Sequence, residues 1–273
     1  MDVKPTGDAL GAFVSDVDLS QPLSEQTTTA LRQAWLEHLV LVFPNQPLAP
    51  ADFLAFAQTI GEPGRYPFVT GLADFPDVIE VKKLENERNN FGGIWHSDTV
   101  YLEQPPMASM LVAREIPPTG GDTEFANMYH AWESLRPDLQ HVLEPLQAVN
   151  RSDLAEVSKT RSDRLADEPS PERPAYRAVH PAVRTHPETG RKALFVNVAH
   201  TEHFVGMTVE ESRPILEEVF AHQVRDDFVW RLSWEAGMLA LWDNRCLLHH
   251  PINDYHGHRR VMHRITLAGD TPR

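Results

Sequence analysis

A histidine and an aspartate two residues apart, His96 and Asp98, are the first residues whose types and spacing could do chemistry. In an extended backbone such residues point to the same face, so their imidazole and carboxylate groups can bind one metal ion. The pattern is weak on its own, because pairs with the same spacing also occur at 186–188 and 200–202. A lone pair of this kind is more often a surface or core feature than a metal site.

The far end of the chain offers a third ligand. An apolar run closes in Trp-Asp-Asn-Arg at 242–245, and His249 follows it. Two imidazoles and one carboxylate occupy one face of an octahedral ion and leave three positions open, as in non-haem Fe(II) oxygenases. The same ligands could serve a zinc hydrolase, although zinc prefers four-coordinate sites.

Two arginines mark the last predicted strand, at 260–267. Arg260 and Arg264 share one face of this strand, whereas Ile265 and Leu267 lie on the other. If the arginine face points inward, the buried guanidinium groups require anions as partners, and a carboxylate fits the planar guanidinium fork. The alternative is an edge strand whose arginines face solvent.

A pair of glycines, Gly120 and Gly121, stands ahead of Thr123. Glycine pairs favour a turn, and Thr123 would then open a strand with a hydroxyl donor. Taken alone, this is the pattern of an ordinary hairpin turn.

The composition limits which metals and partners fit. The 273 residues carry a formal net charge of −14, which disfavours non-specific binding to nucleic acid or to an anionic membrane. The single cysteine, Cys246, excludes an internal disulfide framework and a cysteine zinc cluster, so histidines and acidic residues remain as metal ligands. Because no targeting segment or membrane span is visible, we expect a cytoplasmic protein.

Hydrophobic periodicity predicts several helices and a larger number of strands. The helices are expected at 24–39, 49–60, 129–135 and 208–222. Thr208 and Glu211 have capping-box spacing for the last helix, although Pro214 could delay its start to Ser212. The strands are expected at 39–43, 78–82, 109–114, 123–126, 193–198, 227–234, 238–242 and 260–267. Turn residues separate these strands, which favours a sandwich or barrel over an alternating α/β sheet.

The segment 151–174 is charged, contains proline and lacks large apolar residues. This composition predicts a mobile loop, which would be either a functional lid or a simple surface excursion. We expect it to interrupt a single domain that spans 1–273.

Several longer motifs, in this order and spacing, resemble those of a known family. They are GDALGAFVSDVDLSQPLSE near the start, IWHSDTVYLEQPPMASMLVAREIPPTGGDTEFAN in the middle, and LWDNRCLLHHP with HRRVMHRITLAGD at the end. Over nearly its whole length the chain resembles the Fe(II)/2-oxoglutarate-dependent dioxygenases of the TauD/TfdA family. The resemblance implies an α+β, mainly β fold, namely a double-stranded β-helix (jelly roll) flanked by helices.

The resemblance also assigns roles to individual residues. It implies that iron is bound by His96, Asp98 and His249, and it selects His249 over the adjacent His250. It implies that the distal carboxylate of 2-oxoglutarate is held by Thr123 and Arg260. Arg264 matches an arginine near the iron-bound end of the cosubstrate, from which it can also approach an anionic substrate.

The reaction implied by the resemblance is hydroxylation of a small organic anion of the sulfonate, sulfate ester or aryloxyalkanoate type. 2-Oxoglutarate and O2 are the cosubstrates, succinate and CO2 are co-products, and some hydroxylated products would collapse to a carbonyl compound. Halogenation is not expected, because related halogenases carry a small residue at the position of Asp98. The alternatives are a zinc hydrolase on the same ligands and a metal-binding jelly-roll protein without oxygenase activity.

The substrate side departs from the taurine enzyme of this family. Tyr66 stands roughly where that enzyme has a substrate-binding histidine, and Gly92 stands where it has an asparagine. Together with Phe68 and Arg264, these residues predict a roomier and more apolar pocket for an alkyl or aryl organic anion. We expect no nucleic-acid or membrane partner, and a homodimer or homotetramer, as in the family.

Overall fold

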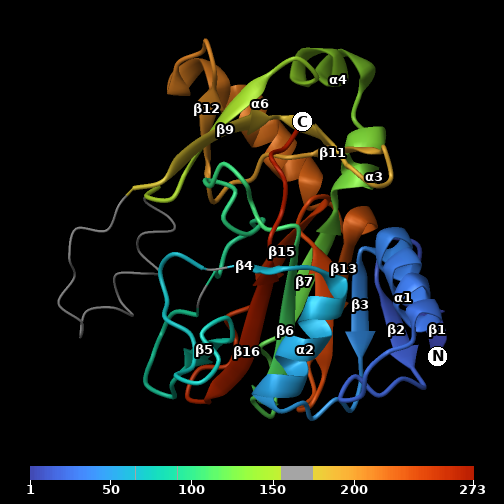
Figure 1. Ribbon diagram of the computed structural model, residues 1–273. Coiled ribbons are helices and arrows are strands. Elements are labelled where there is room, and N and C mark those ends of the chain that lie inside the picture. The colour runs from blue at the N-terminus through green and yellow to red at the C-terminus, as the bar shows by residue number, and fades with distance from the viewer. Residues whose placement is uncertain (65, 91, 155–174) are drawn as a thin grey trace.

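The computed structural model describes residues 1–64, 66–90, 92–154 and 175–273. In this part of the chain the protein is a mixed α/β structure made mainly of strands (Figure 1). The helices of the described residues include none with the length and apolar character needed to cross a membrane.

The largest sheet has eight strands. Its main path runs β1-β2-β3-β14-β6-β16-β4, and β5 pairs with β16 on the same edge as β4. Neighbouring strands are antiparallel, except that β2 and β3 are parallel. The strands are β1 (Asp2–Pro5), β2 (Ala12–Ser15), β3 (Val40–Phe43), β4 (Pro63–Gly64), β5 (Ile79–Lys83), β6 (Ala108–Glu115), β14 (Leu239–Asp243) and β16 (Arg260–Leu267).

The described residues also form three smaller antiparallel sheets. The first has the order β13-β7-β15, with β13 (Val229–Leu232), β7 (Thr123–Asn127) and β15 (Leu247–Pro251). The second has the order β12-β8-β9, with β12 (Thr201–Phe204), β8 (Gln147–Arg151) and β9 (Arg177–Pro181). The third pairs β10 (Val183–Thr185) with β11 (Lys192–Leu194).

Helices lie in two places around these sheets. The helices are α1 (Glu25–His38), α2 (Pro50–Ile60), α3 (Met128–Glu133), α4 (Pro137–Leu143) and α6 (Val209–Gln223), with a short 3-10 helix at Asp226–Phe228. Helices α1 and α2 pack along the large sheet, whereas α3, α4 and α6 gather with β9, β11 and β12 at the top of Figure 1.

Strands of the large sheet present alternate residues to two different cores. Val40 and Trp242 belong to the core between this sheet and β7, β13 and β15, whereas Leu41 and Leu241 face α1 and α2. The alternation follows from the two-residue period of a strand.

The same alternation fixes the direction of the two arginines of β16. Met262 lies in the core between the sheets, whereas Ile265 and Leu267 face the helices. Arg260 and Arg264 share the face of Met262 and are only 6% and 5% exposed. The arginine face therefore points inward, and the edge-strand alternative is wrong.

Most predicted elements are confirmed to within two residues of their bounds. The last predicted helix, α6, begins after Thr208 and not at Ser212. Thr208 Oγ1 accepts a hydrogen bond from the Glu211 backbone, while the Glu211 carboxylate accepts one from the Thr208 backbone. Pro214 lies in the second turn of this helix without delaying its start.

Two strand predictions are wrong in extent. Of the segment 193–198, only Ala193 and Leu194 belong to β11. The segment 227–234 begins within the 3-10 helix, and only its residues in β13 form a strand. Strand β15 was not predicted, because Leu-Leu-His-His-Pro contains neither alternation nor a run of apolar residues. Of the predicted mobile loop at 151–174, Arg151 is the last residue of β8, and residues 155–174 lie outside the described residues.

A buried polar network fixes the turn between β14 and β15. The Arg245 guanidinium donates to both carboxylate oxygens of Asp243, through Nε at 2.8 Å and Nη2 at 2.7 Å. His186 Nδ1 accepts from the backbone of Glu188, so its Nε2 donates to Asp243 at 3.1 Å. Burial alone would raise the pKa of Asp243, but Arg245 and His186 outweigh it and hold that pKa well below its ordinary value.

Replacement of Asp243 by Asn should destabilise the protein strongly. The variant removes the fully buried Asp243 carboxylate from the Arg245 guanidinium, which is 2% exposed and keeps only the partly exposed Glu188 as an anionic contact among the described residues. The loss of one partner of a buried pair costs about 3–5 kcal/mol. Urea unfolding at pH 7 measures the change, and Asp138→Asn in the exposed Arg136–Asp138 pair is the matched control, expected to leave the midpoint almost unchanged.

The pH dependence of stability gives a second test of the Asp243–Arg245 pair. Because the pKa of folded Asp243 lies below its usual 3.8, its contribution is complete above that pH and is lost as the pH falls below it. The Asp243→Asn variant should therefore lose less stability than wild type between pH 5 and pH 3 (roughly the range in which Asp titrates). Equal acid sensitivity would contradict this account.

Candidate active site

Three side chains that could hold a metal ion meet between the large sheet and the sheet of β13, β7 and β15. His96 and Asp98 lie in the connection from β5 to β6, and His249 lies on β15. The Asp98 Oδ1 atom is 3.8 Å from Nε2 of each histidine, and the three ligand atoms lie within 4.8 Å of one another. All three residues are less than 9% exposed.

Backbone hydrogen bonds hold the two histidines together. The amide of His96 donates to the His249 carbonyl at 3.0 Å, and the amide of His249 donates back at 2.8 Å. The reciprocal pair brings the two rings to a centroid distance of 4.1 Å. The neighbouring His250 points away from the centre, toward Glu124 at 3.1 Å, so the geometry favours His249 as the ligand.

The ligand side chains have the ionisation states that a metal requires. His96 Nδ1 lies 2.7 Å from the Ile94 carbonyl and donates to it, which leaves the Nε2 lone pair for a metal. Burial lowers the pKa of His96 and of His249, so both imidazoles are neutral. Burial alone would raise the pKa of Asp98, but the Arg264 guanidinium and the hydrogen bond from Ser109 lower it, and the carboxylate stays ionised.

The ligands and both arginines line one small cavity that opens to solvent. Arg264 Nη2 lies 2.8 Å from Asp98 Oδ1, close enough for an ion pair, but its N–H groups make no hydrogen bond to that oxygen. Arg260 Nε and Nη2 also make no hydrogen bond within the described residues. Buried guanidinium donors are costly without acceptors, so the cavity suits an anion beside a metal ion.

Thr123 lies at the Arg260 end of this cavity, where it opens β7. Its Oγ1 accepts a hydrogen bond of 3.0 Å from Trp234 Nε1. Because indole nitrogen only donates, the Thr123 hydroxyl proton has to point elsewhere, and the cavity is available to it. Trp234, whose ring lies 5.8 Å from the Arg260 guanidinium carbon, carried no sequence signal of this role.

The residues predicted for the substrate side belong to an aromatic cluster. Tyr66 contacts Phe68 with ring centroids 5.6 Å apart, and the Arg264 guanidinium carbon lies 5.2 Å from the Tyr66 ring. The other members could not be predicted from the sequence, because they come from distant segments. They are Tyr101 and Tyr176, 6.0 Å and 5.5 Å from Phe68, and His200, 4.9 Å from Tyr101 and 6.3 Å from His96.

The two other histidine–glutamate pairs with a spacing of two residues, at 186–188 and 200–202, have other roles in the structure. His186 and Glu188 belong to the polar network around Asp243 and Arg245. Cys246 lies near His186 and Asp243, but both imidazole nitrogens of His186 and both oxygens of Asp243 already have hydrogen-bond partners. In the pair at 200–202, Glu202 binds Arg151, whereas His200 faces the aromatic cluster.

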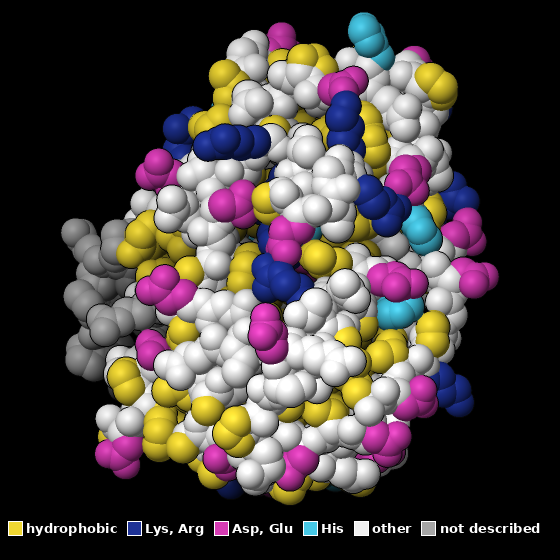
Figure 2. Space-filling model, turned by 45° about the vertical axis from the view of Figure 1, so that its right-hand side comes forward, with side chains coloured by type: hydrophobic (Ala, Val, Ile, Leu, Met, Phe, Trp, Pro, Cys, Tyr) yellow, Lys and Arg dark blue, Asp and Glu magenta, His cyan; other side chains and the backbone are white. Residues whose placement is uncertain are grey.

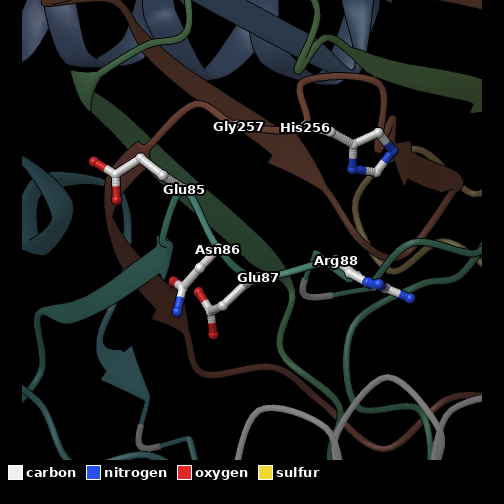
Figure 3. A pocket seen from close by; sticks show the side chains of 6 residues that line it. All are labelled: Glu85, Asn86, Glu87, Arg88, His256 and Gly257. Carbon is white, nitrogen blue, oxygen red and sulfur yellow. The ribbon is translucent and has the colours of Figure 1, made fainter.

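A second pocket, lined by residues 85–88, 256 and 257, lies at the surface. Figure 3 shows its side chains spread around the opening without a common centre. Glu85 pairs with Arg259, and Glu87 accepts from the Leu84 backbone at 2.5 Å. Figure 2 shows acidic and basic side chains interspersed over one face of the molecule, in contrast to the arginine-lined cavity inside.

Gly92 lies against a metal ligand. Its φ is +73°, and a Cβ atom there would be 2.8 Å from His96 Cε1 and 3.2 Å from Nε2. The glycine is therefore needed for the position of the His96 ring, a role that the sequence interpretation as a substrate contact missed.

Replacement of Gly92 by Ala should displace His96 and weaken metal binding by tenfold or more, measured by Co(II) titration of the metal-free protein. Gly190→Ala is the matched control, because its φ is +70° but nothing lies within 4 Å of a Cβ at that position. Both variants carry the same backbone strain, so equal Co(II) affinities would contradict the role of Gly92.

Comparisons with known proteins agree with this geometry. The family model described as taurine catabolism dioxygenase TauD, TfdA family, matches residues 2–266. The alpha-ketoglutarate-dependent 2,4-dichlorophenoxyacetate dioxygenase of Cupriavidus pinatubonensis is 33% identical, over 97% of each chain. The alpha-ketoglutarate-dependent sulfate ester dioxygenase of Pseudomonas putida is 31% identical, over 100% of this chain and 91% of its own.

A solved taurine dioxygenase from Burkholderia xenovorans superimposes with a TM-score of 0.83 at 32% identity, over 99% of this chain and 92% of its own. The comparisons of sequence and of structure thus point to the same family over almost the whole chain. The protein belongs to the TauD/TfdA family and, like its relatives, is a dioxygenase that depends on Fe(II), 2-oxoglutarate and O2.

Proposed function

We propose that this enzyme hydroxylates a small organic anion with an apolar or aryl body. The observation that carries the proposal is a buried, arginine-lined cavity that adjoins both the three metal ligands and an aromatic cluster. The strand arrangement, in which the large and mainly antiparallel sheet faces the sheet of β13, β7 and β15 with helices outside, supports a jelly roll formed by one domain.

The metal-ligand roles fit the donor set. Two neutral imidazoles and one carboxylate suit Fe(II), and His96, Asp98 and His249 would hold it. When bound, Fe(II) with 2-oxoglutarate and O2 supplies the oxidising power of the reaction. The chain contributes the position of these groups and a water-poor cavity around them.

Arg260 and Thr123 would bind the distal carboxylate of 2-oxoglutarate. Arg260 is buried with unsatisfied N–H donors, and burial lowers its pKa, so an anion is the partner it lacks. Thr123 would donate its hydroxyl proton to the same carboxylate, since Trp234 already occupies its oxygen as donor. Arg264 would face the metal-binding end of the cosubstrate.

The charges that line the cavity favour a singly charged substrate anion. Fe(II), Arg260 and Arg264 bring four positive charges, of which Asp98 cancels one and the 2-oxoglutarate dianion cancels two. One positive charge remains in a buried site, where an unmatched charge is unfavourable. A carboxylate, sulfonate or sulfate ester group on the substrate would match it near Arg264.

The aromatic cluster would receive the rest of the substrate. Tyr66 and Phe68 lie on the Arg264 side, and Tyr101 and His200 lie on the His96 side. Aromatic surfaces of this kind offer ring stacking and apolar contact to the body of the substrate. Relatives that act on a chlorinated phenoxyacetate and on sulfate esters support this class of substrate.

Replacement of Arg260 by Ala should weaken binding of the 2-oxoglutarate analogue N-oxalylglycine by about two to four orders of magnitude, since breaking a buried ion pair costs about 3–5 kcal/mol. Trp234→Phe should weaken it by roughly three- to tenfold through the loss of one hydrogen bond. Calorimetry on the Mn(II)-loaded protein measures both. Arg259→Ala, at the exposed neighbouring residue, is the control, and a change below twofold in Arg260→Ala would refute the assignment.

Succinate release under air should be stimulated more by phenoxyacetate and by alkyl sulfates than by taurine. Phe68→Ala should raise KM for phenoxyacetate more than KM for a short alkyl sulfate, because only the aryl substrate loses a ring contact. A panel assayed at equal concentration provides the measurement. Taurine as the best substrate, or equal KM changes for the two anions, would contradict an aromatic-lined substrate site.

A further inference from the structure

A chain of hydrogen bonds ends on Oδ2 of Asp98, whereas the two histidines lie near Oδ1. Trp242 Nε1 donates to Asn244 Oδ1 at 2.9 Å, and Asn244 Nδ2 donates to Ser109 Oγ at 2.9 Å. Ser109 Oγ then donates to Asp98 Oδ2 at 2.5 Å. The chain connects β14 and the turn after it, through β6, to the candidate metal centre.

The direction of every bond in this chain is fixed by its two ends. An indole nitrogen can only donate, and an ionised carboxylate can only accept. A flipped Asn244 amide would set two donors against each other at Trp242, so its oxygen faces Trp242 and its nitrogen faces Ser109. The Ser109 hydroxyl accepts from Asn244 and has one proton left, which goes to Asp98.

The chain is also held rigidly. Ser109 and Trp242 are directly opposite in the β6–β14 ladder and are 0% and 2% exposed. The Asn244 backbone donates to the Met107 carbonyl at 2.9 Å and accepts from Ser97 Oγ at 2.8 Å. These bonds fix the Asn244 backbone, and the bonds to Trp242 and Ser109 fix its side-chain amide.

One carboxylate oxygen of Asp98 is thereby withdrawn from the metal. Oδ2 accepts from Ser109, whereas Oδ1 is the atom 3.8 Å from both histidine nitrogens. We propose that Ser109 is a positioning residue that makes Asp98 a one-oxygen ligand, with Trp242 and Asn244 orienting its hydroxyl. This inference rests on the metal-ligand roles in the proposed function.

The consequence concerns the number of open positions. Three protein atoms on an octahedral ion leave three positions, two for the chelating cosubstrate and one for a diatomic gas. A carboxylate that binds through both oxygens would fill the last position. Ser109 would keep that position open, because its hydrogen bond occupies Oδ2 and leaves only Oδ1 to bind a metal.

The test measures nitric oxide affinity of the full-length protein loaded with saturating Fe(II) and 2-oxoglutarate under anaerobic conditions. Nitric oxide binds the open position of Fe(II), and electron paramagnetic resonance detects the complex. Ser109→Ala should lower the nitric oxide affinity tenfold or more. Ser109→Thr, which keeps the hydroxyl, should stay within threefold of wild type.

Asn244→Leu tests the chain independently of Ser109. The Ser109 hydroxyl remains in this variant but loses the Asn244 donor that orients it. The nitric oxide affinity should therefore fall, but less than in Ser109→Ala. If the role of Ser109 were merely structural, Ser109→Ala and Asn244→Leu would have lower melting temperatures and an unchanged nitric oxide affinity. That outcome would overturn the proposal.

The wild-type protein separates this inference from the proposed function. If wild type with Fe(II) and 2-oxoglutarate gives no visible charge-transfer band, or if the band persists in His96→Ala, the assigned ligands are wrong and the inference falls with them. If the band is present and depends on His96, but Ser109→Ala binds nitric oxide like wild type, only the role of Ser109 is refuted.

Discussion

The Asp98 carboxylate is almost completely removed from water, and a carboxylate in that position is tolerated only when cations and hydrogen-bond donors surround it. Arg264 on β16 supplies the cation, and Ser109 on β6 supplies the donor. Each partner comes from a different strand, so the strands must meet in one register for the charge to be matched. The same requirement brings the histidine of β15 and the segment 96–98 to one point.

The large sheet meets this requirement by using its two faces differently. One face of β6, β14 and β16 is apolar and packs on α1 and α2, while the other carries Ser109, Trp242 and the two arginines. A slip of one residue would turn buried guanidinium groups toward the helices and apolar side chains toward the cavity. The ion pair between Asp243 and Arg245 opposes such a slip, because it fixes the turn that leaves β14.

Residue types and spacing offered His96, Asp98 and a later histidine as metal ligands, but the resemblance to the TauD/TfdA family was needed to select His249 and to turn the arginines inward. The structure brings the three side chains together and buries both arginines. The existence of β15 was beyond such reasoning, since it depends on pairing with β7, more than 100 residues away in sequence. The extent of β11 was missed for another reason, because the mainly apolar run 193–198 continues past the last residue that pairs with β10. The aromatic cluster was only half predicted for the same reason. His200 stood in a pair that spacing alone could not separate from a surface feature, and its place beside Tyr101 became visible only in three dimensions.

Glycine at position 92 illustrates a different limit. Its substitution relative to the taurine enzyme was interpreted as a change in the substrate pocket, whereas its missing side chain makes room for the His96 ring. A sequence shows that a position is small, but it does not show which neighbour needs the space.

The reciprocal amide bonds between His96 and His249 also bear on how the protein is made. More than half of the chain separates the two histidines, and a ribosome adding about 5–20 residues per second needs roughly 8 to 30 s to cover that distance. Until β15 has emerged and paired with β7, the nascent chain offers only a weak two-ligand contact. The three-ligand iron site therefore forms only after most of the chain has been translated, and an incomplete polypeptide does not bind redox-active iron at this site.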